Sequence, residues 1–319
     1  MKFSEEQLKM FAAPLSSTED QQCQNAIVMV RDALIGIGFT DDNKKIEKLY
    51  EDTLSYSIQM RSLSGSRKIK IFIQGSYANN TNVRTHSDVD IAVVQEETFF
   101  TAYRPGITKK DYGFVDAEKP IKTFKDEVQE ALEKKFGNDV ERKNKSIKVN
   151  GNTYRKDADS VPCKRYRNYL NDFKNDPNDY VGGIYINADD GSIIINYPEQ
   201  HIENGRQKNT DTDHYYKKMV RIIKKMRYLM EDNNIISAKN VSSFGLESLL
   251  WNIPNNYFKK YYRYGFIFSD ILKYLSSNSL LFGLFKEANG IKDLCPNQED
   301  CKHFNDFILD LIKFYEYSV

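Results

Sequence analysis

Residues 75–94 read GSYANNTNVRTHSDVDIAVV, and this stretch decides which fold we expect for the chain. The preceding residues 68–74, KIKIFIQ, alternate between polar and apolar side chains except at Phe72, which predicts a strand. The apolar run from Val89 to Val94 is typical of a short central strand that is buried on both faces. A polar segment joins the two strands and contains the residues that could carry chemistry.

Asp88 and Asp90 stand on either side of Val89 at the start of the second strand. Side chains alternate along a strand with a period of two, so both carboxylates are expected on the same face. Two neighbouring negative charges repel each other and need cations or water beside them. Two Mg²⁺ ions about 3.5–4 Å apart can activate an attacking hydroxyl and stabilise a departing pyrophosphate. The pair therefore indicates a two-metal site for Mg²⁺ or Mn²⁺.

Gly75-Ser76 follows the first strand directly and precedes a short polar turn that we expect to be helical. Glycine lets the backbone approach an anion closely, a helix start offers unpaired N–H groups, and the Ser76 hydroxyl is a further donor. The alternative is a tight turn followed by a capping aspartate. The coincidence of a strand, a glycine–serine turn and paired carboxylates favours a site that places a phosphate beside a metal ion.

These residues carry a family resemblance. The run from Gly75 to Val94 resembles the signature of the polymerase-β-like nucleotidyltransferase superfamily. More narrowly, it resembles the CD-NTases of anti-phage signalling systems, the bacterial relatives of cyclic GMP–AMP synthase and oligoadenylate synthase, and among these clade E and its near neighbours. Further stretches support the likeness, namely ADSVPC at 158–163, INYPEQHIENGRQKN at 195–209, YKKMVRIIKKMRYL at 216–229 and SSFGLESLLWNIPN at 242–255.

The resemblance implies a third catalytic acid on a neighbouring strand. The family places this acid in a pattern similar to Asp-x-Val-Pro, which Asp159-Ser160-Val161-Pro162 matches. Its implied role is to complete the metal site and to help take the proton from the attacking ribose hydroxyl. Asp157 is a rival, because it would point to the same face of the strand. The resemblance, rather than the spacing, favours Asp159.

The resemblance also implies nucleotide contacts outside this core. Lys224 maps onto a lysine that holds the triphosphate as a point charge, and Ser243 onto a serine that donates to it. Phe244 takes the place of a tyrosine that stacks on the base; it could equally be a core residue. Asn196 maps onto a position that reads the edge of a base. His201 is expected to be structural, because two-metal phosphoryl transfer requires no histidine.

The pattern along the chain and the resemblance together predict an α+β protein in three parts. Residues 1–66 are expected to be helices that pack on the core, with helical runs at Asp20–Gly36 and Lys44–Arg61. Residues 67–209 would form a polymerase-β-like core with a mixed sheet, and residues 210–319 a helical lobe, with the active site in a cleft between these lobes. Within the core we expect a helix at Lys119–Lys135 and hairpins at Asn150-Gly151 and Asp190-Gly191.

Composition places few limits on this interpretation. Apolar residues make up 40% and charged residues 29% of the chain, as in ordinary globular proteins. The four cysteines indicate free thiols in a reducing compartment, and the amino-terminal stretch resembles no secretory signal, so we expect a cytoplasmic protein without a membrane association. Cys295, Cys301 and His303 lack the spacing of a zinc site and are expected to be structural.

The leading hypothesis is a synthase that joins ATP and a second nucleotide, GTP or UTP, into a cyclic dinucleotide. This messenger would act on a separate effector protein. One alternative keeps the chemistry and transfers a nucleotide to an RNA, a protein or a small molecule. Another is a nucleic-acid sensor, or an enzyme that structured RNA or DNA activates, because basic clusters could form a positive groove at Lys44-Lys45-Lys48, Arg61, Arg67-Lys68-Lys70 and 217–227.

Overall fold

The computed structural model describes residues 2–83, 88–118 and 120–318. The chain divides into two compact units, each assembled from separate stretches of sequence. The sheet unit comprises Ser16–Tyr77 and Asp88–Glu199, and the helical unit comprises Met1–Leu15, Ala78–Ser87 and Gln200–Val319. This division differs from the three predicted parts, because the first fifteen residues and the segment 78–87 group with the C-terminal helices.

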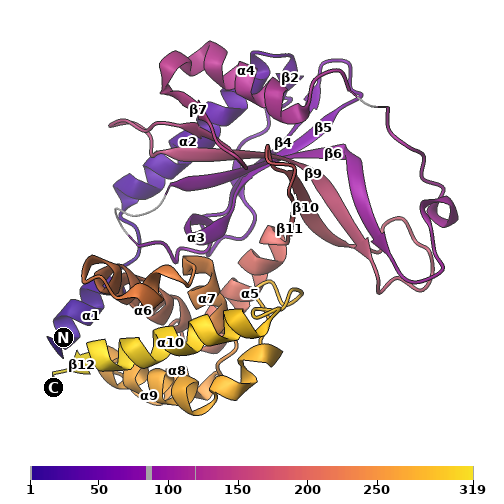
Figure 1. The fold of residues 1–319 in the computed structure, drawn as a ribbon. Helices are drawn as coiled ribbons and strands as arrows, with labels where there is room; N and C mark the ends of the chain where they lie inside the picture. Colours follow the sequence, from indigo (N-terminus) through magenta and orange to yellow (C-terminus); the bar gives the residue numbers. More distant parts are fainter. Residues whose placement is uncertain (1, 84–87, 119, 319) are drawn as a thin grey trace. The chain divides into compact units, whose positions relative to one another are not determined.

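The strands of the sheet unit form one mixed sheet (Figure 1). Their bounds are β2 Phe39–Thr40, β3 Glu47–Lys48, β4 Tyr56–Ser62, β5 Lys68–Ile73, β6 Val89–Tyr103, β7 Val140–Arg142, β8 Ile147–Val149, β9 Ala158–Tyr169, β10 Val181–Asn187 and β11 Ile193–Asn196. The order is β11-β10-β9-β6-β5-β4-β2, while β3 pairs with β4, β8 with β9 and β7 with β8. Strands β6 and β9 are parallel and the other paired strands are antiparallel. The central pair β6 and β9 therefore comes from distant parts of the sequence.

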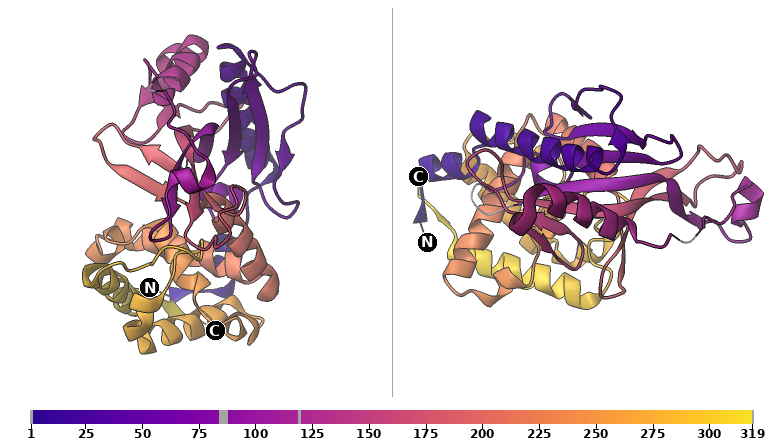
Figure 2. Two further views of the ribbon diagram at one scale, coloured as in Figure 1. Left: turned by 90° about the vertical axis from the view of Figure 1, so that its right-hand side faces the viewer. Right: turned by 90° about the horizontal axis from the view of Figure 1, so that it is seen from above.

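Two helices of the sheet unit pack beside each other against this sheet. Helix α2, Ser17–Ile35, contacts β4, β5 and β6, and helix α4, Phe124–Phe136, contacts β7, β8 and β9 (Figures 1 and 2). Each begins with a capping box, Ser16 with Glu19 in α2 and Thr123 with Asp126 in α4. The short helices are α3 Gly75–Ala78, η1 Lys109–Tyr112 and η2 Gly137–Asp139.

The structure confirms most of the predicted strands and corrects one helix. Strand β5 and the buried start of β6 are confirmed, although β6 continues to Tyr103. The prediction of a helix over Lys44–Arg61 is wrong. Tyr56, Ile58 and Met60 are buried at alternate positions of strand β4, which pairs with β5. Helix α4 begins at its Thr123 cap, and the expected start at Lys119 lies outside the described residues.

Both predicted hairpin pairings are present. Strand β8 pairs antiparallel with β9 across the segment that contains Asn150-Gly151, and β10 pairs with β11 across Asp190-Gly191. The first connection is a longer loop over 150–157, whereas Gly191 has the positive φ of +83° that a tight turn requires. These local signals thus predicted both strand pairings correctly, but they predicted a loop between β8 and β9 that is too short.

The helical unit has a single large apolar core, which α6 crosses. Its elements are β1 Lys2–Phe3, α1 Glu5–Phe11, α5 Pro198–Asp211, α6 Tyr216–Asp232, η3 Ile236–Lys239, α7 Ser243–Trp251, α8 Asn256–Lys259, α9 Tyr264–Ser277, η4 Ser279–Leu284, α10 Gln298–Phe314 and β12 Glu316–Tyr317. Strands β1 and β12 pair in parallel, so both ends of the chain meet in this unit (Figure 1). Within the described ranges, no helix has the length and apolar character needed to cross a membrane. The α+β fold is therefore as predicted.

Candidate active site

The register of β6 and β9 brings the predicted carboxylates together. Asp90 lies directly opposite Asp159 in this parallel pair, and residues paired in register share a face of the sheet. One position earlier, the Val89 backbone N–H donates to the Asp157 carbonyl oxygen at 2.8 Å, which sets Asp88 beside Asp157. The structure therefore gathers Asp88, Asp90 and Asp159, the three acids singled out in the sequence.

The electrostatics of Asp90 reflect this crowding. Burial, reinforced by the negative charges of Asp159 and Asp88, raises the pKa of Asp90 to about 7, while Lys143 acts in the opposite direction. A carboxyl group next to two others favours the neutral form unless a cation compensates the charge. The repulsion among the three carboxylates would therefore be relieved by a nearby cation.

The donor set fits Mg²⁺, although the neighbouring carboxylates do not already stand in a metal-binding arrangement. Within the part of the chain that the structure describes, no three or more His, Cys, Asp or Glu side chains already converge as a metal-binding group. Mg²⁺ needs only one or two carboxylates, with phosphate oxygens and waters completing its octahedron. Asp88, Asp90 and Asp159 supply hard oxygen donors from two neighbouring strands. They are the residues that would hold the ions.

Asp157 makes contacts of a different kind. Its Oδ1 accepts the Gly151 backbone N–H at 2.5 Å, and its Oδ2 lies 3.0 Å from Lys148 Nζ. Burial alone would raise the pKa of Asp157, but these two partners lower this pKa below its ordinary value. Both carboxylate oxygens are thus engaged in holding the loop between β8 and β9. This geometry supports Asp159 over Asp157 as the third acid, and the catalytic assignment itself stays a prediction.

Gly75 lies against the carboxylate of Asp90. Its φ is +67°, and a Cβ built on it would stand 2.9 Å from Asp90 Oδ2. The backbone N–H of Gln74 donates to the Asp90 carbonyl oxygen at 2.9 Å, so the turn is joined to β6 at this residue. Ser76 follows in α3 and is partly exposed. The glycine is thus required by the approach to Asp90, and phosphate binding by Gly75 and Ser76 stays a prediction.

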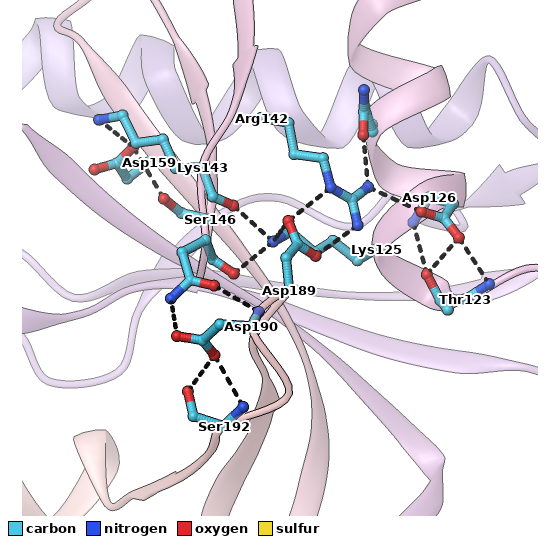
Figure 3. A network of polar contacts seen from close by, with 12 residues as sticks. Thr123, Lys125, Asp126, Arg142, Lys143, Ser146, Asp159, Asp189, Asp190 and Ser192 are labelled. Atoms are coloured by element: carbon cyan, nitrogen blue, oxygen red, sulfur yellow. Dashed lines mark hydrogen bonds and ion pairs between the residues drawn. The ribbon is translucent and has the colours of Figure 1, made fainter.

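Two lysines of the β7–β8 hairpin complete the site and were missed in the sequence. Lys148 Nζ lies 3.0 Å from Asp88 Oδ2, and Lys143 Nζ lies 3.3 Å from Asp159 Oδ1 (the second pair is drawn in Figure 3). The hydrogen bonds that Lys148 donates to Asp157 and Asp88 raise the pKa of Lys148 well above its ordinary value. Lys148 lies opposite Asp159 in the observed register of β8 and β9. The tight turn predicted between these strands implies a different register, so no signal in the sequence indicated this placement.

Three of the predicted nucleotide-contact residues, Lys224, Ser243 and Phe244, lie in the helical unit. Lys224 is only 2% exposed, and its Nζ lies 2.6 Å from Glu247 Oε2. The buried carboxylate of Glu247 therefore already neutralises Lys224, and contact of Lys224 with a triphosphate stays a prediction. Ser243 follows the N-cap residue Ser242 of α7.

Phe244 is 37% exposed and meets the His201 ring edge-on, with centroids 4.9 Å apart. The core interpretation of Phe244 is thus wrong. Its role in stacking on a base stays a prediction, as does that of Asn196, the partly exposed last residue of β11.

Many side chains of the basic clusters in the described part of the chain are buried or lie beside acidic residues. In α6, Lys217, Arg221 and Lys224 recur at helical spacing on one buried face. In the sheet unit, several basic side chains have acidic partners, in the pairs Arg61 with Asp42, Arg67 with Glu127 and Lys70 with Glu199. Lys44 and Lys45 are exposed, so the expected nucleic-acid surface retains only part of its charge.

Comparison with known proteins found two matching family models. A nucleotidyltransferase domain model matches residues 58–154, and the model of the cGAS/DncV-like nucleotidyltransferase C-terminal helical domain matches residues 203–316. The chain is 49% identical over 319 residues to a cyclic GMP–AMP synthase of Staphylococcus schleiferi, covering 100% of this chain and 98% of the relative. It is 34% identical over 294 residues to a cyclic dipyrimidine nucleotide synthase of Cecembia lonarensis, covering 92% and 90% of the two chains.

Two solved structures share the whole fold. The cyclic dinucleotide synthase of Elizabethkingia meningoseptica, solved with GTP and Apcpp, superposes with a TM-score of 0.71 at 31% identity, covering 98% of both chains. The c-UMP-AMP synthase of Rhodothermus marinus, solved with Apcpp and Upnpp, gives 0.75 at 26% identity, covering 99% of this chain and 98% of its own. With the carboxylates gathered on β6 and β9, these matches show that the chain belongs to the cGAS/DncV-like nucleotidyltransferase family.

Proposed function

We propose that this protein is a cyclic dinucleotide synthase that joins two nucleoside triphosphates with the help of divalent cations. The observation that carries the proposal is the pairing of Asp90 with Asp159 across β6 and β9, with Asp88 adjacent. Relatives named as cyclic GMP–AMP, dipyrimidine and UMP–AMP synthases support a cyclic product. Nucleotidyl transfer to an RNA, a protein or a small molecule has no comparable support among these relatives.

The reaction would proceed by two similar transfers. A ribose hydroxyl oxygen of one nucleotide bonds to the α-phosphorus of the other, the bond between its α- and β-phosphates breaks, and pyrophosphate leaves. Asp159 would take up the hydroxyl proton, and Asp88 and Asp90 would orient the reacting groups. Bound Mg²⁺ or Mn²⁺ would activate the hydroxyl and stabilise the charge that develops on pyrophosphate. A second transfer within the linear dinucleotide closes the ring and releases another pyrophosphate.

We propose ATP as one substrate, with GTP or UTP as the second. The structures solved with GTP and Apcpp, and with Apcpp and Upnpp, support this choice. Gly75 and Ser76 would hold the phosphates, Ser243 and Lys224 the triphosphate tail, Phe244 would stack on a base and Asn196 would read its edge. For Lys224 this role requires that the ammonium exchange its partner Glu247 for phosphate.

The test is product analysis with active-site variants. The purified protein is incubated with all pairs of the four NTPs and Mg²⁺, treated with phosphatase, and analysed by mass spectrometry for resistant products. We expect a cyclic dinucleotide that contains adenine, and a loss of about 10²-fold or more in rate for Asp88→Asn, Asp90→Asn and Asp159→Asn. Asp157→Asn should retain activity. If all products are linear or linked to an acceptor, the cyclic assignment is overturned. If Asp157→Asn loses activity and Asp159→Asn keeps it, Asp157 is the third acid.

We further propose that the product is an anti-phage messenger for a separate effector protein, made in the cytoplasm. This step depends on the family resemblance. The exposed lysines Lys44, Lys45 and Lys68 leave room for activation by structured RNA or DNA. Synthesis measured with and without such nucleic acid at 50 and 200 mM salt would test it, since binding to phosphates weakens steeply with salt.

A further inference from the structure

The β7–β8 hairpin carries two positive charges into the carboxylate cluster. Lys148 pairs in register with Asp159, and its Nζ lies 3.0 Å from Oδ2 of both Asp88 and Asp157. Lys143 Nζ lies 3.3 Å from Asp159 Oδ1 and 3.9 Å from Asp88 Oδ2. Both lysines therefore contact carboxylates that would ligate the cations. A metal ion and an ammonium group would compete for the same oxygen atoms.

Side chains of α4, β7 and the turn between β10 and β11 hold the backbone at the tip of this hairpin in place. Lys125, which is 7% exposed, donates to the carbonyl oxygens of Lys143 at 2.7 Å and Asn144 at 2.8 Å, and its ammonium lies 2.9 Å from Asp189 Oδ2. Arg142 binds both oxygens of Asp189 (Figure 3). A cation could not displace the lysines by moving the hairpin without breaking these bonds.

The lysine side chains, in contrast, are flexible and partly exposed. The Lys143 side chain is 35% exposed and that of Lys148 18%, and each has four rotatable bonds. Asp159 would keep a hydrogen bond after Lys143 leaves, because Ser146 Oγ donates to its Oδ1 at 3.2 Å. The site can therefore exchange ammonium for metal by side-chain rotation, while the strands and the orientation of Asp159 are maintained.

We infer that Lys143 and Lys148 are built-in counter-charges, which pair with Asp88 and Asp159 in the metal-free protein and are displaced when divalent cations bind. The inference rests on the proposed function, because it takes these aspartates as the metal ligands. The lysines would lower the intrinsic metal affinity. Stable occupancy would then require the extra oxygen ligands of a bound triphosphate, so that metal and nucleotide bind together.

Metal binding without nucleotide tests the inference directly. Mn²⁺ affinity is measured by electron paramagnetic resonance of free Mn²⁺ for the full-length protein, for Lys143→Gln, Lys148→Gln and the double variant. We expect the double variant to bind Mn²⁺ about tenfold more tightly than the unmodified protein, since two nearby positive charges are removed. Its melting temperature without metal should fall, because the carboxylates lose their partners, and added Mn²⁺ should restore it.

Two controls separate the possible outcomes. Lys145→Gln removes one charge from the same hairpin turn. The exposed Lys145 side chain interacts electrostatically with Asp190, so this variant should leave Mn²⁺ affinity unchanged. Asp90→Asn should abolish binding; if it binds Mn²⁺ like the unmodified protein, the metal site of the proposed function is wrong. The counter-charge inference is overturned if Asp90→Asn loses Mn²⁺ binding but the lysine variants bind Mn²⁺ no more tightly than the unmodified protein. It is also overturned if neither the unmodified protein nor any variant binds Mn²⁺. If Lys148→Gln does not fold, Lys143→Gln alone tests the inference, because Lys143 is the more exposed of the two lysines.

Discussion

At Gly75 a backbone requirement and a chemical one coincide. The φ of +67° is strained for any residue with a Cβ, and that Cβ would stand 2.9 Å from Asp90 Oδ2. The nearest atom is the free end of a side chain, so the clash would be relieved by rotating the Asp90 carboxylate. Substitution should therefore alter the orientation of a predicted metal ligand in addition to straining the turn.

We expect Gly75→Ala to lower the free energy of unfolding by about 1–3 kcal/mol through backbone strain, and to reduce dinucleotide synthesis by at least about tenfold. Denaturant unfolding and a product assay measure the two effects. Gly65→Ala is a matched control, because Gly65 has a φ of +76° and nothing lies within 4 Å of its would-be Cβ. It should lose similar stability and keep its activity. Equal activity losses in both variants would show that the approach to Asp90 is unimportant.

At the scale of elements, the β7–β8 hairpin depends on a buried lysine of α4. Lys125 Nζ donates to two backbone carbonyl oxygens of the hairpin turn and pairs with Asp189 in the turn between β10 and β11. Hydrogen bonds from Arg142 and then Lys125 outweigh partial burial and lower the pKa of Asp189 to about 2. One side chain thus joins a helix and two hairpins.

Lys125→Met should remove three hydrogen bonds and cost about 1–3 kcal/mol in the free energy of unfolding. Arg142 still binds Asp189 in this variant, and the Asp189 backbone N–H still donates to the Asn144 carbonyl oxygen. Hydrogen exchange of the amides in residues 143–149 should accelerate more than exchange in β5, because the loss is local. Lys122→Met is the control, since its ion pair with Glu130 is exposed on both sides and contributes little. Uniform acceleration across the sheet would contradict a local role for Lys125.

The elements that the sequence predicted are those with local signals. Strand β5, the start of β6 and both hairpin pairings follow from alternation and from Asn-Gly and Asp-Gly pairs. The segment Lys44–Arg61 was misassigned, although Tyr56, Ile58 and Met60 alternate, because strand character there becomes decisive only through pairing with β5. The pairing of Asp90 with Asp159 joins residues far apart in the chain, and only the family resemblance had suggested it.

At the scale of the whole molecule, the helical unit contains a segment from the middle of the nucleotidyltransferase motif. Residues 78–87 follow Gly75-Ser76-Tyr77 and precede Asp88, yet they group with the C-terminal helices. A buried polar network holds the described part of this segment: Thr81 Oγ1 donates to Glu247 Oε2 at 2.7 Å, and Lys224 Nζ donates to the Thr81 carbonyl oxygen at 3.2 Å. Sequence patterns could not reveal this network, since Lys224 and Glu247 meet only when α6 packs against α7.

Glu247 is the central acid of this network. It is 1% exposed and lies between Lys224 Nζ at 2.6 Å and His201 Nε2 at 2.8 Å. Burial alone would raise the pKa of Glu247, but the charge of Lys224 and the interactions with His201 hold this pKa well below its ordinary range. We expect Glu247→Gln to cost about 3–5 kcal/mol in the free energy of unfolding, because Lys224 would remain charged and buried without its counter-ion. Denaturant unfolding at pH 7 measures this loss.

The pH dependence and a double variant complete this prediction. A carboxylate whose pKa is lower in the folded chain stabilises the fold above its unfolded pKa of about 4.3, and this contribution declines as the pH falls further. The difference between the unmodified protein and Glu247→Gln should therefore be constant above pH 5 and shrink below pH 4. Lys224→Met combined with Glu247→Leu removes both charges and should recover most of the stability. If synthesis recovers with it, Lys224 is structural; if stability recovers but KM for ATP rises, Lys224 also binds the triphosphate. A double variant less stable than Glu247→Gln would contradict the ion-pair explanation.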